Sequence, residues 1–197
     1  TEAGINGLQD LVKIVPGFNY TESAFGTPVY TLRGVGFYET SIGAKPTVSV
    51  YVDEVPLPFS VLARGATLDL ERVEVLKGPQ GTLFGQNAPG GAINYIAAKP
   101  TDELSASARA TIERFGRFSL EEHVSGPLSS GLNARLAIKA DQGGAWQKNS
   151  TRPDKLGDAE FYAARFILDT EPSDTVRLSL NVNGWKDKGD ETAAQLL

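Results

Sequence analysis

The sequence predicts an α+β domain followed by antiparallel β-strands of an incomplete transmembrane β-barrel. Three observations support this fold class: the pattern changes near Pro100, short apolar runs alternate with Gly/Pro turns before it, and longer strands with a period of two follow it. We therefore expect two domains, one over residues 1–100 and one over residues 101–197, the second being the N-terminal strands of the barrel.

The first domain is expected to open with a short helix. Apolar side chains recur there at i, i+3, i+4 and i+7, which gives one apolar stripe. They are Leu8, Leu11, Val12 and Val15. Asn6 is a suitable N-cap, and Pro16-Gly17 would end the helix. Short strands are expected at residues 30–32, 48–52, 73–76 and 92–97, with Asp53-Glu54 as a turn and residues 68–72 as one helical turn.

Apolar and polar residues alternate in four segments of the second domain, at 106–112, 132–140, 162–168 and 176–182. The polar face of each segment carries charged side chains, which must face water. The turns at 126–131 and 171–174 are short, whereas the connection at 143–158 is long. Transmembrane barrels have short periplasmic turns and longer outer loops, and Trp146, Tyr162 and Trp185 lie near strand ends, where an aromatic girdle would sit.

A fifth strand over residues 118–124 alternates less cleanly, because Glu122 shares the apolar face with Leu120 and Val124. Either a bulge near Glu121-Glu122 shifts the phase, or Glu122 lies near the membrane interface. About five strands would leave two open edges, which lipid does not tolerate. We therefore expect most of the barrel to lie outside this sequence.

Composition narrows the function classes. The formal net charge of -5 disfavours a nucleic-acid partner. With no cysteine and a single histidine, His123, the chain cannot form a disulfide, a Cys-ligated zinc site or a His-rich metal site. The Gly-rich segment 78–91 lacks the Lys of a phosphate-binding loop. Five carboxylates could be considered as a catalytic set, but they lie on expected turns and strand faces, where solvated charges are the simpler interpretation: Asp53, Glu54, Asp69, Glu71 and Glu74. No nucleophile and base support a hydrolase, since no motif surrounds His123. We expect no enzyme, no cofactor and no resident metal.

One segment carries a specific resemblance. It reads LERVEVLKGPQGTLFG over residues 70–85 and continues as GGAINYI over residues 90–96. This segment resembles the plug signature of TonB-dependent receptors of the bacterial outer membrane. LVKIVPG at 11–17, LRG at 32–34 and VDEVP at 52–56 occur in the family's order and at its spacing, so that the matches cover about residues 8–100.

The resemblance implies roles for individual residues. Arg33 and Lys77 stand where the family has two plug arginines that pair with barrel glutamates, and Lys77 lacks the bidentate fork of the more common Arg. Aromatic residues at the outward loops 21–27, 36–45 and 58–64 are candidates for substrate contact, with packing in the local core as the alternative. The candidates are Phe25, Phe37, Tyr38 and Phe59, and Phe18 and Tyr20 lie nearby.

The resemblance also implies a function. A scarce solute, most often a ferric siderophore, would bind at the outer face and cross the bacterial outer membrane by active transport. The energy would come through TonB, which grips a segment N-terminal to residue 1, and outer-membrane lipid would surround the barrel. The alternatives are a passive porin-like barrel, which would have no plug signature, and a soluble glycan-binding β-protein, which the apolar stripes of four strands oppose.

Overall fold

The computed structural model describes residues 8–22, 27–36, 46–79, 89–148, 153 and 155–190. The chain divides into two compact units, Thr1–Ala97 and Ala98–Leu197. Each unit is described by itself.

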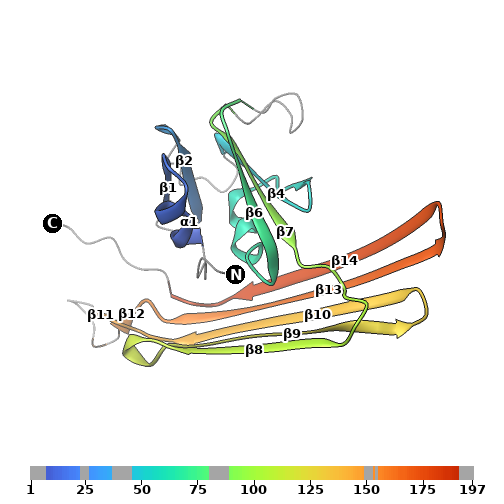
Figure 1. Ribbon diagram of the computed structural model, residues 1–197. Coiled ribbons are helices and arrows are strands. Elements are labelled where there is room, and N and C mark those ends of the chain that lie inside the picture. Colours follow the sequence, from blue (N-terminus) through green and yellow to red (C-terminus); the bar gives the residue numbers. More distant parts are fainter. Residues whose placement is uncertain are drawn as a thin grey trace. The chain divides into compact units, whose positions relative to one another are not determined.

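The described residues of the first unit form one α-helix, α1 (Leu8–Ile14), and two small sheets (Figure 1). The first sheet has the order β1-β2-β3, from β1 (Phe18–Glu22), β2 (Pro28–Leu32) and β3 (Val35–Gly36). The second has the order β5-β4-β7-β6, from β4 (Val48–Val52), β5 (Val55–Pro56), β6 (Leu70–Lys77) and β7 (Gly91–Ala97). A 3₁₀ helix, η1 (Ser60–Gly65), connects β5 to β6. These elements confirm the predicted α+β class.

The core of this unit lies around β7, which is buried at every residue. β7 pairs in parallel with β4 and antiparallel with β6, so it is a central strand. Side chains from both sheets, α1 and η1 surround it; the largest include Leu11, Phe18, Tyr30, Leu32, Val50, Ile93 and Tyr95. A central strand that is covered on both faces is expected to be continuously apolar, as GAINYIA nearly is.

Two local predictions for the first unit are wrong. Residues 70–72 belong to strand β6 rather than to a helical turn, because Leu70 and Arg72 pair with the end of β7. Val12 is 41% exposed and does not share a buried stripe with Leu11 of α1 and the half-buried Val15, which follows the helix. The predicted N-cap, Asn6, lies outside the described residues.

The second unit is a five-stranded antiparallel sheet with the order β14-β13-β10-β9-β8 (Figure 1). Its strands are β8 (Ser105–Ile112), β9 (Phe118–Ser129), β10 (Leu132–Gly143), β13 (Ala159–Ser173) and β14 (Val176–Asp187). A short 3₁₀ segment, η2 (Arg114–Gly116), joins β8 to β9. A two-stranded hairpin of β11 (Gln147–Lys148) and β12 (Lys155–Leu156) lies in the long connection between β10 and β13. The described sheet is open, with β8 and β14 as its edges.

The strands are longer than predicted, since both segments predicted as turns are largely strand. β9 runs to Ser129 and β13 to Ser173, which leaves turns of only two residues. Pro127 fits within β9 because β8 begins opposite Ser125, so that Pro127 has a partner strand on one side only. Pro172 falls in the irregularity between Thr170 and Ser173, where ladder pairing is interrupted.

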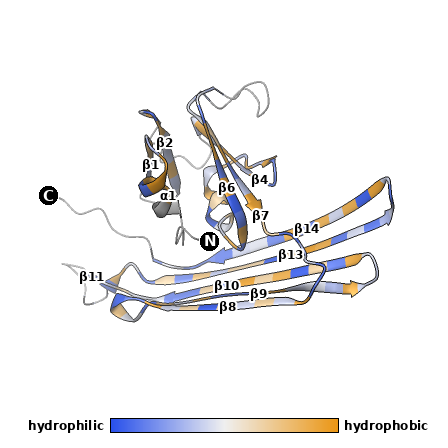
Figure 2. Ribbon diagram, in the orientation of Figure 1, coloured by the Kyte–Doolittle hydropathy of each residue, from blue (hydrophilic) through white to orange (hydrophobic). Residues whose placement is uncertain are grey.

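The register gives this sheet one apolar and one polar face, as the alternating colours of β8 to β14 show in Figure 2. The pairing of β9 is unbroken from Phe118 to Ser125 on both sides, so the bulge that was one of two alternatives for Glu122 is absent. Glu122 is opposite Ala108 on β8 and Ile138 on β10 and therefore belongs to the apolar face. None of the helices in the described part of the chain is long and apolar enough to span a membrane.

Candidate functional site

Asp53 and Glu54 form a two-residue turn between β4 and β5, with φ of 48° and 69°. Hydrogen bonds join this turn to the end of β7. The Asp53 N–H donates to the Tyr95 carbonyl at 2.9 Å, and the Ala97 N–H donates to Asp53 Oδ1 at 2.9 Å. The parallel pairing of β4 with β7 brings these groups together from positions 44 residues apart in the chain.

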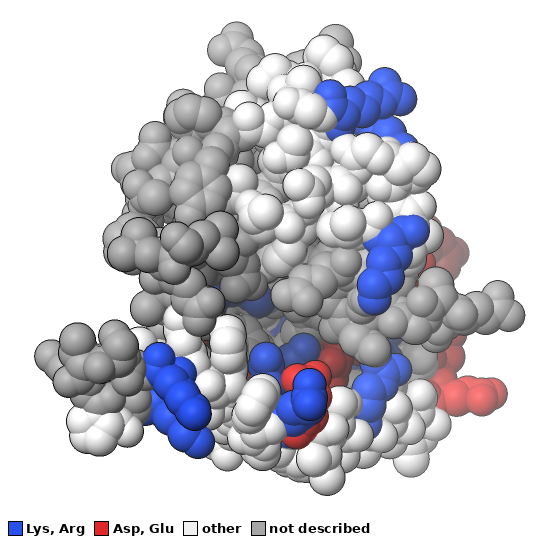
Figure 3. All heavy atoms as spheres, turned by 90° about the vertical axis from the view of Figure 1, so that its left-hand side faces the viewer, with Lys and Arg blue, Asp and Glu red and all other residues white. Residues whose placement is uncertain are grey.

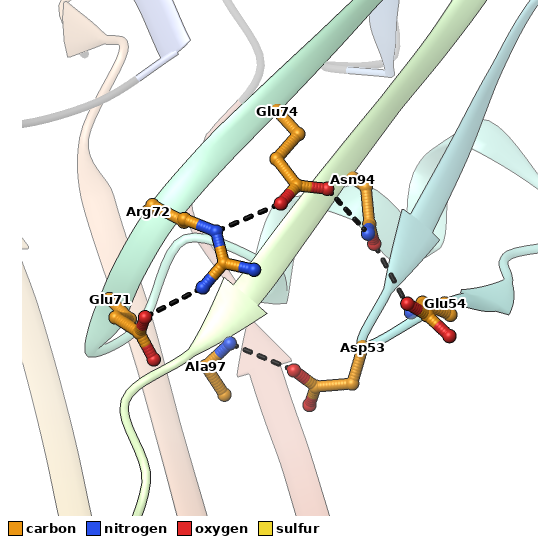
Figure 4. A network of polar contacts seen from close by, with 7 residues as sticks. All are labelled: Asp53, Glu54, Glu71, Arg72, Glu74, Asn94 and Ala97. Carbon is orange, nitrogen blue, oxygen red and sulfur yellow. Dashed lines mark hydrogen bonds and ion pairs between the residues drawn. The ribbon is translucent and has the colours of Figure 1, made fainter.

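Asn94 connects the turn to β6 (Figure 4). Its side chain is 1% exposed; its Oδ1 accepts from the Glu54 N–H at 3.1 Å, and its Nδ2 donates to Glu74 Oε2 at 3.3 Å. Arg72 extends the network by donating to Glu74 Oε1 at 2.8 Å and to Glu71 Oε1 at 2.6 Å. The bond with Glu74 raises the pKa of Arg72, and the bonds from Arg72 and then Asn94 lower the pKa of Glu74.

We call this network the β7 clamp; its members are Asp53, Glu54, Glu71, Arg72, Glu74, Asn94 and Ala97. Three of the five carboxylates considered as a catalytic set, those of Asp53, Glu71 and Glu74, accept hydrogen bonds here. Glu54 takes part only through its backbone N–H. A general acid at neutral pH needs a raised pKa, whereas the pKa of Glu74 is lowered. The β7 clamp is therefore suited to fixing the ends of three strands where the chain leaves the first unit.

Arg33 and Lys77 are the predicted partners of barrel glutamates, and they lie at the β2–β3 turn and at the end of β6. Arg33 lies at the β2–β3 turn with φ of 51°, is exposed, and directly follows Leu32, whose side chain lies against Gly91. Lys77 is opposite Gly91 in the β6–β7 ladder and is half-buried. Neither side chain forms an ion pair with any described residue.

Gly90 and Gly91 allow the two sheets of the first unit to approach each other closely. A Cβ atom on Gly91, which has φ of 138°, would lie 2.3 Å from the Leu76 carbonyl oxygen and 2.7 Å from Leu32 Cδ1. A Cβ atom on Gly90 would lie 3.1 Å from Val35. The two sheets of the first unit therefore meet at a place that only glycine fits, which we call the glycine seam.

The predicted aromatic contacts are only partly described. Phe25, Phe37 and Tyr38 lie outside the described residues. Phe59 immediately precedes η1 and is 43% exposed. The segment 58–64 is not an open loop throughout, because η1 buries Ala63. Phe18 is buried and packs on Tyr30, with ring centroids 6.1 Å apart, and the Tyr20 ring lies 5.9 Å from Tyr30, which favours core packing for both.

The polar face of the second unit carries paired charges. Lys139 Nζ lies 3.6 Å from Glu121 Oε2 across β10 and β9. Arg117 donates two hydrogen bonds to the Asp141 carboxylate, the one from Nε at 2.8 Å. His123 lies on the same face, opposite Ala137. In the described part of the chain, no group of three or more His, Asp or Glu side chains is arranged to hold a metal ion.

Trp185 lies on the polar face, contrary to its predicted place in an aromatic girdle. It is opposite Ala163, whereas Tyr162 belongs to the apolar face with Phe166. Its ring stacks on Phe161, with centroids 6.2 Å apart and an interplanar angle of 24°. The signal was present in the sequence, since Trp185 is three residues from the apolar Val182 and a strand alternates with a period of two.

Basic side chains do not gather on the face shown in Figure 3. The Lys and Arg side chains there lie in separate groups among uncharged residues, and acidic side chains adjoin some of them. This distribution lacks the continuous basic stripe that nucleic-acid binding needs.

Comparisons with known proteins agree with this architecture. The sequence model of the TonB-dependent Receptor Plug Domain matches residues 1–92. The pesticin receptor of Yersinia enterocolitica is 30% identical over 180 residues, which cover 88% of this chain. The catecholate siderophore receptor Fiu of Escherichia coli is 35% identical over 113 residues, which cover 56% of this chain. The crystal structure of the ferric yersiniabactin uptake receptor FyuA from Yersinia pestis superposes with a TM-score of 0.76 over 87% of this chain at 28% identity.

An α+β unit that continues into an open sheet with one apolar and one polar face is a plug domain followed by strands of an outer-membrane barrel. The chain belongs to the TonB-dependent receptor family, and its location is the bacterial outer membrane. It spans 26% of the length of the pesticin receptor, 14% of Fiu and 27% of the FyuA chain. The relatives named above are receptors.

Proposed function

We propose that this chain is the plug and first barrel strands of a receptor that actively transports a ferric siderophore across the outer membrane. The observation that carries the proposal is the plug unit itself, which continues directly into the two-faced sheet. A passive barrel has no need of a plug. A unit that fills a lumen must move before solute passes, and that movement requires energy.

The outer membrane holds no ion gradient, so the energy comes through TonB, which engages a segment N-terminal to the plug. The relatives support the solute class, since Fiu is named as a catecholate siderophore receptor and FyuA as a ferric yersiniabactin uptake receptor. Transport in this scheme involves no catalytic step and no resident cofactor or metal. Phe25, Phe37, Tyr38 and Phe59 are proposed as substrate contacts from the plug.

The test uses the complete gene in its host. Its deletion should abolish uptake of radioactive iron from at least one ferric siderophore under iron limitation, and the complete gene should restore uptake only where TonB is present. Restored uptake without TonB would support the passive-barrel alternative. Uptake of an oligosaccharide but of no ferric complex would support the glycan alternative.

Arg33 and Lys77 are proposed to hold the plug through glutamates of the barrel. Two observations support this role: their side chains form no ion pair among the described residues, and both lie beside the glycine seam. Arg33→Glu in the complete receptor should place like charges together, loosen the plug and raise sensitivity to large antibiotics such as vancomycin. Lys77→Arg should not raise it, because Arg adds a bidentate contact. Unchanged sensitivity of Arg33→Glu would contradict the role.

A further inference from the structure

Phe161 of β13 and Trp185 of β14 form an aromatic pair on the polar face of the sheet. The register places Ala163 opposite Trp185 and Asp187 opposite Phe161, so the two rings are diagonal neighbours. Diagonal pairs are within reach of aromatic side chains, and these two stack. Both rings are partly exposed.

Membrane anchoring does not explain the position of this pair. Aromatic residues anchor a barrel from its apolar face, at the level of the lipid headgroups, and Tyr162 is placed for that role. Phe161 and Trp185 share the opposite face with Arg165 and Asn183. The indole N–H of Trp185 forms no hydrogen bond with any described residue.

The pair lies at the outer end of the sheet. The two-residue turns lie at one end, and the long connection that contains β11 and β12 lies at the other, as Figure 1 shows. Longer connections mark the outer end of a transmembrane barrel. Phe161 is the third residue of β13, and Trp185 is two residues from the end of β14, so both rings lie near those connections.

Two charged side chains beside the pair have oppositely charged partners, and Asp187, opposite Phe161, accepts a hydrogen bond from the Gly189 N–H. Asp141, opposite Phe161, accepts hydrogen bonds from Arg117, and Lys139, opposite Ala163, lies near Glu121. A ligand that approaches this part of the face meets little unpaired charge from these residues. The ligand would instead contact two partly exposed aromatic rings and one indole N–H group.

We propose that Phe161 and Trp185 bind an aromatic iron-chelating group of the ferric siderophore, a phenolate or a catecholate, by stacking and by a hydrogen bond from the indole N–H. The proposal rests on the proposed function and narrows its substrate class to aryl-bearing siderophores. An aliphatic trihydroxamate offers no ring for stacking and would gain little from this pair. Stacked aromatic rings gain affinity beyond the burial of their surface.

The test measures binding of ferric complexes to the complete receptor in detergent, by quenching of tryptophan fluorescence. A ferric aryl siderophore and a ferric aliphatic trihydroxamate are compared for the wild type and Trp185→Ala, Trp185→Phe and Trp146→Ala. Trp185→Ala should raise the Kd of the aryl complex at least 10-fold. Trp185→Phe, which keeps the ring, should raise it less, and Trp146→Ala should leave it unchanged.

Two outcomes would overturn the inference. One is an unchanged Kd for the aryl complex in a Trp185→Ala receptor whose circular dichroism and thermal unfolding match the wild type. The other is a wild-type receptor that binds only the aliphatic complex, which would refute the aryl preference and leave siderophore transport intact. Failure of the wild type to bind any ferric complex would instead contradict the proposed function.

Discussion

Glu54 occupies a backbone conformation that favours glycine. Its φ of 69° lies in the left-handed region, whereas the comparable β2–β3 turn has Gly34, with φ of 78°, at the same position. A non-glycine residue held there costs on the order of 1 kcal/mol. The Glu54 side chain is exposed and forms no hydrogen bond or ion pair with another described residue. The bond that holds this conformation comes from the Glu54 backbone N–H to Asn94, and a glycine would keep it.

Glu54→Gly should therefore stabilise the plug. For a fragment spanning residues 1–100, urea unfolding should show a free energy of unfolding higher by about 1 kcal/mol. Glu54→Ala is the matched control, because it removes the carboxylate and keeps the strain. Equal stabilisation by both substitutions would show that charge, and not backbone strain, is the cause.

Glu74 should make the stability of the plug depend on pH. Its pKa is lowered in the folded state by Arg72 and then Asn94, so the carboxylate stabilises the fold above its unfolded pKa of about 4.3. That contribution is lost as the pH falls through the folded pKa. Glu74→Gln should be less stable than the wild type at pH 6, and the difference should shrink towards pH 3.

The measurement is urea unfolding of the fragment spanning residues 1–100 across this pH range. Glu54→Gln is the control, because the exposed Glu54 side chain forms no hydrogen bond or ion pair with a described residue. A stability difference between wild type and Glu74→Gln that is the same at pH 6 and pH 3 would show that the hydrogen bond from Arg72 does not favour the ionised form.

Glu122 is an acidic residue on the lipid-facing side of β9, and the register explains how it is tolerated. One row further towards the outer end, the apolar face carries Tyr162 and Lys186, which are residues of the membrane interface. Successive rows of side chains on one face of a sheet, two residues apart along each strand, are separated by about 7 Å. Glu122 is thus a single row inside the interface, which favours the interfacial alternative over a bulge.

At the scale of elements, the glycine seam joins the two sheets of the plug. Gly91→Ala would push a methyl group into the Leu76 carbonyl oxygen and the Leu32 side chain. Overpacking typically costs about 1–3 kcal/mol, and the positive φ adds strain. We expect the fragment spanning residues 1–100 to lose at least about 2 kcal/mol of stability.

Gly78→Ala is the control for Gly91→Ala. Gly78 also has a positive φ, of 92°, but a Cβ there would meet nothing within 4 Å. The difference between the two variants in urea unfolding therefore isolates the close approach of the sheets. If both lose the same stability, backbone strain alone explains the cost of replacing Gly91, and the close approach of the two sheets has no role.

Some elements could be predicted from the sequence and others could not. β4 was predicted with its observed bounds, because VSVYV is strongly apolar and a turn follows it. β1 and η1 were missed, since FNYTE and SVLARG carry no strong periodicity and are fixed by packing on β2. The β7 clamp was not predicted either, because the bond between Asp53 and Ala97 depends on a parallel pairing that no local pattern encodes.

At the scale of the whole molecule, the two units present different surfaces to water. The plug has its own core, whereas the sheet exposes apolar side chains along one face and leaves β8 and β14 without outer partners in the described structure. The exposed apolar residues of its last three strands include Leu136, Ile138, Phe166, Leu178, Leu180 and Val182. Open edges and apolar faces both promote association in water.

Residues 1–197 should therefore aggregate in water, whereas residues 1–100 should stay soluble. Light scattering of both in detergent-free buffer would distinguish them, and addition of detergent should disperse the longer chain by covering its apolar face. Replacing Leu178, Leu180 and Val182 with threonine separates the two causes: if the apolar face dominates, aggregation should weaken, and if the edges dominate, it should persist. A monodisperse monomer of residues 1–197 without detergent would contradict the assignment of this face to lipid, because such a face is stable in water only when something covers it.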